Sequence, residues 1–243
     1  MSIQAVIFDV YGTLLEVGSP PSDAEARWQE LCRDMLGIEP PLTRLGLSVA
    51  WSRVIAREHD AARVRGIPWP EVHWPSVVTE VLPPLARLSP SDQAEFLLRQ
   101  IQTGHTTHMT TETAAALRRL KGRPVSIGIA SNAQAYTLRE LEQALGTHAL
   151  GMDLFEPDLR FWSFEHGFSK PDPHVFQILT ARLAARGVSP SGTLMVGDRL
   201  DNDLQPAQAM GWLTWHLTPS PTPDGKTAGD WSQFGHRWLD SSL

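Results

Sequence analysis

The hydrophobic positions of this chain fall into two kinds of pattern. Short apolar-rich runs, as expected of strands buried on both faces, occupy 5–8, 125–130, 193–196 and 214–217, and a further candidate is 158–164. Longer segments with apolar residues three and four positions apart, as in amphipathic helices, cover 111–121, 134–145, 174–186 and 204–210. Because strands and helices alternate, the pattern predicts an α/β fold with right-handed βαβ units and a parallel sheet.

This alternation is interrupted directly after the first strand. No strand-like run occurs from 17 to 104, and the helical patterns of this block cover 22–36, 47–65, 72–82 and 92–102. The simplest architecture is a Rossmann-like, doubly wound parallel sheet core formed by 1–16 and 105–243, with an inserted all-helical cap domain at 17–104. A cap hinged beside a site would close over it, exclude water and select the substrate.

The composition is that of an ordinary soluble globular protein, with 42% hydrophobic and 20% charged residues among 243. A formal charge of −6 and the absence of a basic run argue against nucleic acid as a partner. The single Cys32 cannot form an internal disulfide, and the sequence has neither a signal-peptide pattern nor an apolar run of membrane-spanning length. We therefore expect a cytoplasmic protein that acts on a small molecule and binds no membrane. The patterns make no prediction about oligomeric state.

Polar side chains follow three of the expected strands. They are Asp9 and Thr13 after the first strand, Ser131 and Asn132 after the second, and Asp198 and Asp203 after the third. A strand-ending aspartate such as Asp9 can simply cap the following turn. In a parallel sheet, however, all of these strand ends meet at one edge, where α/β proteins bind their ligands. Lys170, in a loop before Pro171, is expected at the same edge.

Several carboxylates at one edge repel each other unless a cation lies among them. Mg²⁺ is the hard cation that takes few carboxylates and keeps several waters. Asp9, Asp198 and Asp203 therefore predict a Mg²⁺ site.

Four motifs in this order resemble those of the haloacid dehalogenase (HAD) superfamily. They are Asp-x-x-Gly-Thr at 9–13, Ser-Asn at 131–132, Lys-Pro at 170–171, and Gly-Asp followed after four residues by Asp at 197–203. The insertion point of the helical block resembles that of the helical-cap (C1-type) subclass. The resemblance covers the whole core and, more weakly, the cap.

This resemblance implies a hydrolase whose nucleophile is Asp9, acting through a covalent aspartyl intermediate. Ser131 would hydrogen-bond the transferring group, and Lys170 would neutralise charge on that group and on Asp9. Thr13 and Asn132 belong to the same expected set of catalytic residues.

The resemblance also implies how the metal would be held. Asp198 would ligate Mg²⁺ together with Asp9 and the backbone carbonyl of Tyr11. Asp203 would help through a water molecule or through Lys170.

Tyr11 departs from the phosphatase pattern of this family. Phosphatases usually have a second aspartate there, which protonates the leaving alcohol and then activates water. A tyrosine, with an ordinary pKa of about 10, is a poor base at neutral pH. The Tyr11-Gly12-Thr13 sequence instead resembles the 2-haloacid dehalogenases, in which halide leaves unprotonated and no metal is used. Those enzymes also need a cap arginine for the substrate carboxylate, and the candidates are Arg44, Arg53 and Arg57.

The last motif favours the opposite conclusion. The segment from Gly197 to Asp203 is of the acidic phosphatase type, with an additional Asp201, and its carboxylates need a cation. A Mg²⁺-dependent phosphatase of a small phosphorylated molecule is therefore the first hypothesis. A metal-free dehalogenase and a slow or inactive phosphate-binding module are the alternatives. Tyr11, a cap histidine (His59 or His73) or metal-bound water could replace the second aspartate, and the sequence selects none of them.

Overall fold

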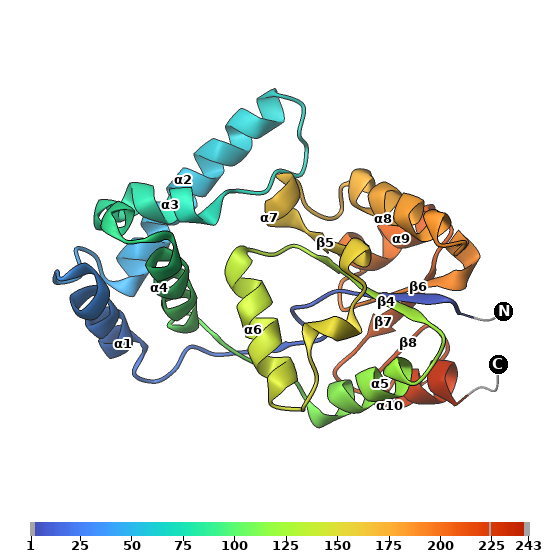
Figure 1. The fold of residues 1–243 in the computed structure, drawn as a ribbon. Helices are drawn as coiled ribbons and strands as arrows, with labels where there is room; N and C mark the ends of the chain where they lie inside the picture. The colour runs from blue at the N-terminus through green and yellow to red at the C-terminus, as the bar shows by residue number, and fades with distance from the viewer. Residues whose placement is uncertain (1–2, 224, 241–243) are drawn as a thin grey trace.

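The computed structural model describes residues 3–223 and 225–240, and its centre is a six-stranded parallel sheet in the order β5-β4-β1-β6-β7-β8 (Figure 1). This confirms the predicted α/β fold. The strands are β1 (Ala5–Phe8), β4 (Ser126–Ser131), β5 (Arg160–Trp162), β6 (Thr193–Gly197), β7 (Leu213–Leu217) and β8 (Ala228–Gly229).

Strand β1 is central, and both of its faces are buried. Val6 and Phe8 belong to one hydrophobic cluster, whereas Ala5 and Ile7 belong to the cluster on the other face. This alternation follows from the two-residue repeat of a strand, and it explains why the β1 sequence is apolar without interruption. Pairing with β4 on one side and β6 on the other places the carboxyl ends of all three strands together.

Helices cover both faces of the sheet (Figure 1). One face is covered by α5 (Thr111–Lys121), α6 (Ala135–Gly146) and α10 (Trp231–Phe234), and the other by α8 (Pro173–Ala185) and α9 (Gln205–Ala209). The remaining elements of the core are short: α7 (Ser163–His166), 3₁₀ turns at Met152–Leu154, Pro157–Leu159 and Pro190–Gly192, and π turns at Leu200–Leu204 and Gly235–Leu239. The core is therefore doubly wound, as predicted.

The inserted block is helical and has a hydrophobic cluster of its own, built around Trp28, Leu47, Val78 and Phe96. Figure 1 shows it gathered beside the core. Its elements are α1 (Ala24–Leu31) with a π turn at Cys32–Leu36, α2 (Arg44–Val64), α3 (Trp74–Val81), a 3₁₀ turn at Pro83–Arg87, and α4 (Pro90–Gln102).

Two short antiparallel strands connect this cap to the core, namely β2 (Glu16–Gly18) and β3 (Thr106–His108). The expectation of no strand from residue 17 onward is therefore wrong at Val17 and Gly18. These strands are mostly exposed and contain no apolar run. They form by pairing with each other, so no hydrophobic pattern in the sequence predicts them. The domain boundaries at 16/17 and 104/105 lie beside this ribbon and stay a prediction.

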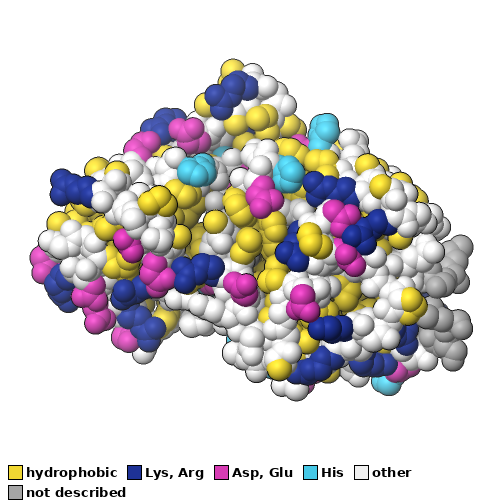
Figure 2. Space-filling view, viewed as in Figure 1, with side chains coloured by type: hydrophobic (Ala, Val, Ile, Leu, Met, Phe, Trp, Pro, Cys, Tyr) yellow, Lys and Arg dark blue, Asp and Glu magenta, His cyan; other side chains and the backbone are white. Residues whose placement is uncertain are grey.

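No helix of the described residues is long and apolar enough to cross a membrane. On the face shown in Figure 2, basic and acidic side chains are interspersed over both the cap and the core.

Candidate active site

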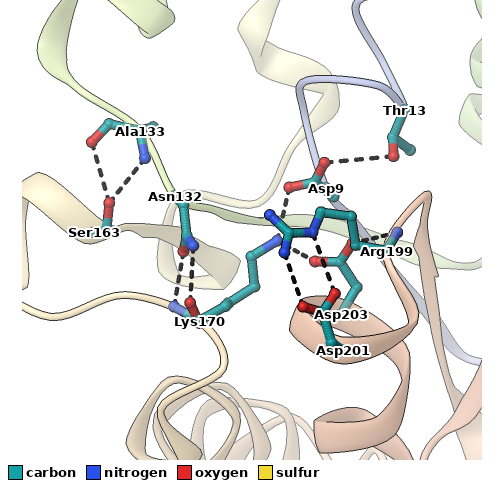
Figure 3. Close-up of polar contacts among 9 residues, drawn as sticks. All are labelled: Asp9, Thr13, Asn132, Ala133, Ser163, Lys170, Arg199, Asp201 and Asp203. Atoms are coloured by element: carbon teal, nitrogen blue, oxygen red, sulfur yellow. Dashed lines mark hydrogen bonds and ion pairs between the residues drawn. The ribbon is translucent and has the colours of Figure 1, made fainter. Parts of the chain in front are cut away.

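Asp9 follows β1 at the carboxyl edge of the sheet and is 8% exposed. Its backbone amide donates to the carbonyl of Val196 at 2.9 Å, which ties it to the neighbouring strand β6. One carboxylate oxygen accepts a hydrogen bond from Lys170 Nζ at 2.7 Å, and the other accepts one from Thr13 Oγ1 at 3.4 Å. The carboxylate of Asp9 is therefore held on both sides (Figure 3).

Lys170 joins two of the predicted acidic residues. Its buried ammonium lies 2.7 Å from Asp9 Oδ1 and 2.5 Å from Asp203 Oδ1. The backbone of Lys170 is fixed by Asn132, whose side chain donates to the Lys170 carbonyl at 2.9 Å and accepts from the Lys170 amide at 2.7 Å. Asn132 thus uses its amide group to hold the lysine loop in place (Figure 3).

Asp9, Asp198 and Asp203 form a group that could hold a metal ion. Each offers a carboxylate oxygen, and these oxygens lie within 4.8 Å of one another. Three carboxylates face the single ammonium of Lys170, so the cluster keeps a formal excess of two negative charges when all are ionised. An all-oxygen donor set with this excess fits a hard dication such as Mg²⁺. The carbonyl of Tyr11 stays a predicted further ligand.

Two glycines allow the acidic side chains to approach the backbone. A Cβ added at Gly197 would lie 2.5 Å from Asp203 Oδ2. One added at Gly12 would clash with the carboxylate of Asp198, and Gly12 also has a φ of +83°. The glycines of both motifs are therefore required by the packing of the acidic cluster.

The charges of this cluster disturb one another. Burial, supported by Asp203 and Asp198 and opposed by Lys170, raises the pKa of Asp9 to about 6. Burial and then the charge of Asp203 also raise the pKa of Asp198. For Lys170, burial acts against the charged form, but the two carboxylates outweigh it and raise its pKa. The cluster therefore attracts either protons or a cation.

Ser131 ends β4 and is 1% exposed. Its hydroxyl has no hydrogen-bond partner within the described chain. A buried hydroxyl without a partner is costly to maintain, so Ser131 has a donor free for a ligand.

The hydroxyl of Tyr11 points toward α6. It donates a short hydrogen bond to the carboxylate of Glu140 and lies 3.0 Å from Thr137 Oγ1. Burial, together with the negative charge of Glu140, raises the pKa of Tyr11 well above its ordinary value. The Tyr11 phenol is thus engaged by Glu140 and is poorly suited to act as a base in this arrangement.

The sequence patterns did not predict Glu140 or His105 at this site. Glu140 is 2% exposed, and its other oxygen lies 3.1 Å from His105 Nε2 on the return path from the cap. The helical spacing could have pointed to Glu140, because it lies on the buried face of α6, four residues before Ala144 and three after Thr137. A charged residue on such a face needs specific partners. His105 had no comparable signal.

A segment of the cap at 69–72, here called the cap strap, lies against the core beside Lys170. Pro70 forms an antiparallel bridge with Phe168, and the Ser169 amide donates to the Trp69 carbonyl at 2.9 Å. Glu71 accepts a hydrogen bond from Ser163 Oγ at 2.7 Å, and burial raises its pKa. Sequence patterns did not predict these contacts.

The Glu71 carboxylate also accepts a hydrogen bond from Gln134 Nε2 at 2.8 Å, and the Ala133 amide donates to Ser163 Oγ at 2.8 Å. The strap therefore contacts the loop that follows Ser131 and Asn132 as well as the loop that carries Lys170.

Two of the other cap candidates have side-chain partners within the cap. Arg57 forms ion pairs with Glu58 and Glu80 at the surface. His73 Nδ1 lies 2.8 Å from Ser76 Oγ at the start of α3. Arg53 is exposed, Arg44 is half-buried, and His59 lines a cavity of about 230 Å³ between α2 and α3.

Comparison with known proteins places this geometry in a family. No curated protein matches the chain at a significant level. Among solved structures, the chain is similar to the putative HAD-hydrolase YfnB from Bacillus subtilis (21% identity, 97% of this chain and 98% of that one, TM-score 0.54), whose structure is described as bound to magnesium. It is also similar to a 2-haloacid dehalogenase from Pseudomonas syringae pv. Tomato DC3000 (21% identity, 96% and 97%, TM-score 0.58). A third is a HAD phosphatase from Thermococcus onnurineus (18% identity, 96% and 96%, TM-score 0.53).

At these identities the solved structures show the fold alone. The family model described as haloacid dehalogenase-like hydrolase, however, matches residues 3–211. That match includes the four motifs around Asp9 and the inserted cap. The chain belongs to the haloacid dehalogenase-like hydrolases.

Proposed function

We propose that this hydrolase is a Mg²⁺-dependent phosphatase that acts on a small phosphorylated molecule through an aspartyl-phosphate on Asp9. The observation that carries the proposal is the acidic cluster. Asp9, Asp198 and Asp203 lie within 4.8 Å of one another with one paired lysine, an arrangement that a dication relieves. Without a metal, only protons would compensate this charge excess, and at neutral pH the pKa of Asp9, about 6, leaves Asp9 mostly ionised.

Asp9 is placed for nucleophilic attack. A carboxylate oxygen of Asp9 would form a bond to phosphorus while the bond from phosphorus to the leaving oxygen breaks, and the electron pair departs on that oxygen. In the second half a water oxygen would bond to phosphorus. The electron pair then returns to Asp9, the water proton passes to solvent, and phosphate is released.

The neighbouring side chains have separate tasks in this reaction. Lys170 lowers the negative charge around Asp9, and the free hydroxyl of Ser131 donates to an oxygen of the transferring group. Thr13 orients the Asp9 carboxylate. Asn132 acts as a positioning residue through the Lys170 backbone. Bound Mg²⁺ supplies positive charge for the phosphoryl oxygens.

A 2-haloacid dehalogenase is the second candidate, and Tyr11 favours it. Because the Tyr11 hydroxyl is engaged by Glu140, the site suits a leaving group that needs no proton. A dehalogenase also needs a cation for the substrate carboxylate. Arg57, one of the three arginine candidates, is paired with Glu58 and Glu80. This weakens the second candidate relative to the phosphatase.

The test compares both activities under the same conditions. The purified protein would be assayed for phosphate release from 4-nitrophenyl phosphate and for halide release from 2-chloropropionate, each with Mg²⁺ and with a chelator. Chelator-sensitive phosphate release supports the proposal. Chelator-insensitive halide release overturns it in favour of the dehalogenase, and Mg²⁺ binding without any turnover overturns it in favour of a binding module.

Two variants connect the activity to the site. Asp9→Asn is expected to reduce phosphate release by at least about 10³-fold, because an amide cannot act as the nucleophile. Asp201→Asn is the matched control from the same edge, since Asp201 is exposed and paired with Arg199. We expect Asp201→Asn to stay within about twofold of the natural protein, because surface pairs contribute little.

A further inference from the structure

The proton of the Tyr11 hydroxyl is directed away from the proposed reaction. Tyr11 donates to Glu140 on α6, whereas the carboxylate of Asp9 is held by Lys170 and Thr13. Glu140 is itself fixed, since its other oxygen lies 3.1 Å from His105 Nε2 and 3.5 Å from Thr107 Oγ1. Three side chains from two segments of the chain therefore converge on this one carboxylate.

The hydrogen bond between Tyr11 and Glu140 is costly to break. The side chain of Glu140 is 1% exposed, so a turn of Tyr11 toward Asp9 would cost a buried carboxylate one of its hydrogen bonds. The ring of Tyr11 is also packed edge-on against His105, with the ring centres 6.0 Å apart. The phenol therefore stays with Glu140 and is not delivered to a leaving group.

We propose that the site selects phosphorylated substrates whose leaving group departs as a stable anion, such as aryl, enol or acyl phosphates, because the hydrogen bond to Glu140 holds the Tyr11 hydroxyl away from the leaving group. This inference rests on the proposed phosphatase function. The bond from phosphorus to oxygen breaks with its electron pair on the leaving oxygen, and that anion takes a proton from solvent only after departure. Alkyl phosphates, whose alkoxide must be protonated as it leaves, are poor substrates of such a site.

The same geometry has a consequence for the second half of the reaction. No base stands at position 11 to activate the attacking water, so hydrolysis of the aspartyl-phosphate is slow relative to its formation from a good leaving group. A rapid first turnover followed by a slower steady state is the kinetic sign of such an intermediate. With 4-nitrophenyl phosphate we therefore expect a burst of about one nitrophenol per active site.

The first experiment measures kcat/KM with Mg²⁺ for 4-nitrophenyl phosphate, phenyl phosphate and an alkyl phosphate such as glycerol phosphate. We expect kcat/KM to fall with increasing basicity of the leaving group, by about 10²–10⁴-fold between the nitrophenyl and alkyl esters, which is the usual contribution of a general acid. Comparable values for the aryl and alkyl esters overturn the inference but leave the phosphatase proposal standing. Absence of chelator-sensitive phosphate release from any ester refutes the phosphatase proposal itself.

The second experiment changes the residues concerned. Tyr11→Phe is expected to keep the dependence on the leaving group, whatever its absolute rate, because the hydroxyl transfers no proton; a steeper dependence would identify Tyr11 as the acid and overturn the inference. The double variant Tyr11→Asp with Glu140→Gln introduces a carboxyl group and removes the like charge of Glu140. We expect it to reduce the ratio of aryl to alkyl kcat/KM by at least about tenfold.

The double variant also needs a check on folding. Its circular dichroism and Mg²⁺ affinity should match those of the natural protein. A folded, Mg²⁺-binding double variant with an unchanged ratio would count against the inference. If the double variant does not fold, the decision rests on Tyr11→Phe and on the substrate series.

Discussion

Single residues of the acidic cluster are held in unfavourable surroundings. Asp9 is nearly buried and has two carboxylates beside it, so its ionised form is stabilised less than in water. Lys170 compensates for part of this repulsion. A bound dication would compensate for the rest, which is why a proton and Mg²⁺ should compete for Asp9.

The first prediction concerns this competition. Because the pKa of Asp9 is raised to about 6, Asp9 binds a proton below that pH and is ionised above it. Mg²⁺ binds the ionised form, so its affinity should weaken by about tenfold per pH unit below pH 6 and be nearly constant from pH 7 upward. Isothermal titration calorimetry at pH 5, 6, 7 and 8 measures this. In Asp9→Asn the slope below pH 6 should diminish, and equal affinity for the natural protein at pH 5 and 8 would contradict the prediction.

The second prediction concerns Gly12, where a side chain would collide with Asp198 and the φ is +83°. Gly12→Ala should displace the Asp198 carboxylate and weaken Mg²⁺ binding by at least about tenfold, since few carboxylates hold the ion. Gly187→Ala is the matched control, because Gly187 has a φ of +77° and open space around its Cα. Both variants should lose about 1 kcal/mol or more of unfolding free energy from backbone strain. If Gly187→Ala weakens Mg²⁺ binding as strongly, strain and not the collision is responsible.

At the scale of elements, the sequence predicted the strands and helices that have a hydrophobic pattern along the chain. It did not predict the structure that forms only when distant segments pair. The buried strand β1 was predictable because its apolar run is uninterrupted, and the helix α5 because its apolar residues recur three and four positions apart. The edge with Asp9 and Asp198 followed from the rule that parallel strands end together. The ribbon of β2 and β3 has no such pattern, because its residues are mostly exposed and the two strands form by pairing with each other.

The candidate site shows the same division. The motifs predicted which residues gather at the site, but they did not predict the hydrogen-bond partners of Asn132 and Tyr11. Asn132 binds the backbone of Lys170, and Tyr11 binds Glu140, which lies 129 positions away along the chain. Neither partner could be identified from local spacing, because both contacts depend on how α6 and the lysine loop fold back onto the strand ends.

A third prediction tests Glu140 as a link between elements. Glu140→Gln should weaken its bonds to Tyr11 and to His105, and so loosen both the loop after β1 and the hinge strand β3. Hydrogen exchange should increase at least about tenfold in peptides covering 10–15 and 104–109, because the free energy of local opening falls. Glu142→Gln, an exposed substitution on the same helix, is the control and should leave both peptides unchanged. Faster exchange in only one of the two peptides would show that Glu140 does not couple them.

On the scale of the whole molecule, the cap is connected to the core in several places. The β2–β3 ribbon is the covalent path, and the cap strap forms a second contact through Pro70, Glu71 and their partners. Helix α4 also meets α6 through the ion pair of Glu95 with Arg139. The strap is held to the residues that precede Lys170 by non-covalent contacts, so it can separate from the core without breaking a covalent bond. Movement of the cap about the ribbon would open and close access to Asp9 by releasing and remaking the strap.

The fourth prediction locks this second contact. Pro70 and Phe168 form an antiparallel bridge, in which Cα atoms lie about 4.5–5.5 Å apart, a range that suits a disulfide. The double variant Pro70→Cys with Phe168→Cys should lose at least about tenfold in kcat/KM when oxidised and recover with reductant, because substrate cannot enter and product cannot leave while the strap is closed. Cys32 is buried in the cap and should not interfere. Each single variant serves as a control that reductant should not affect. Full turnover by the oxidised double variant would mean that the strap is a fixed part of the site, and that substrates reach Asp9 by another route.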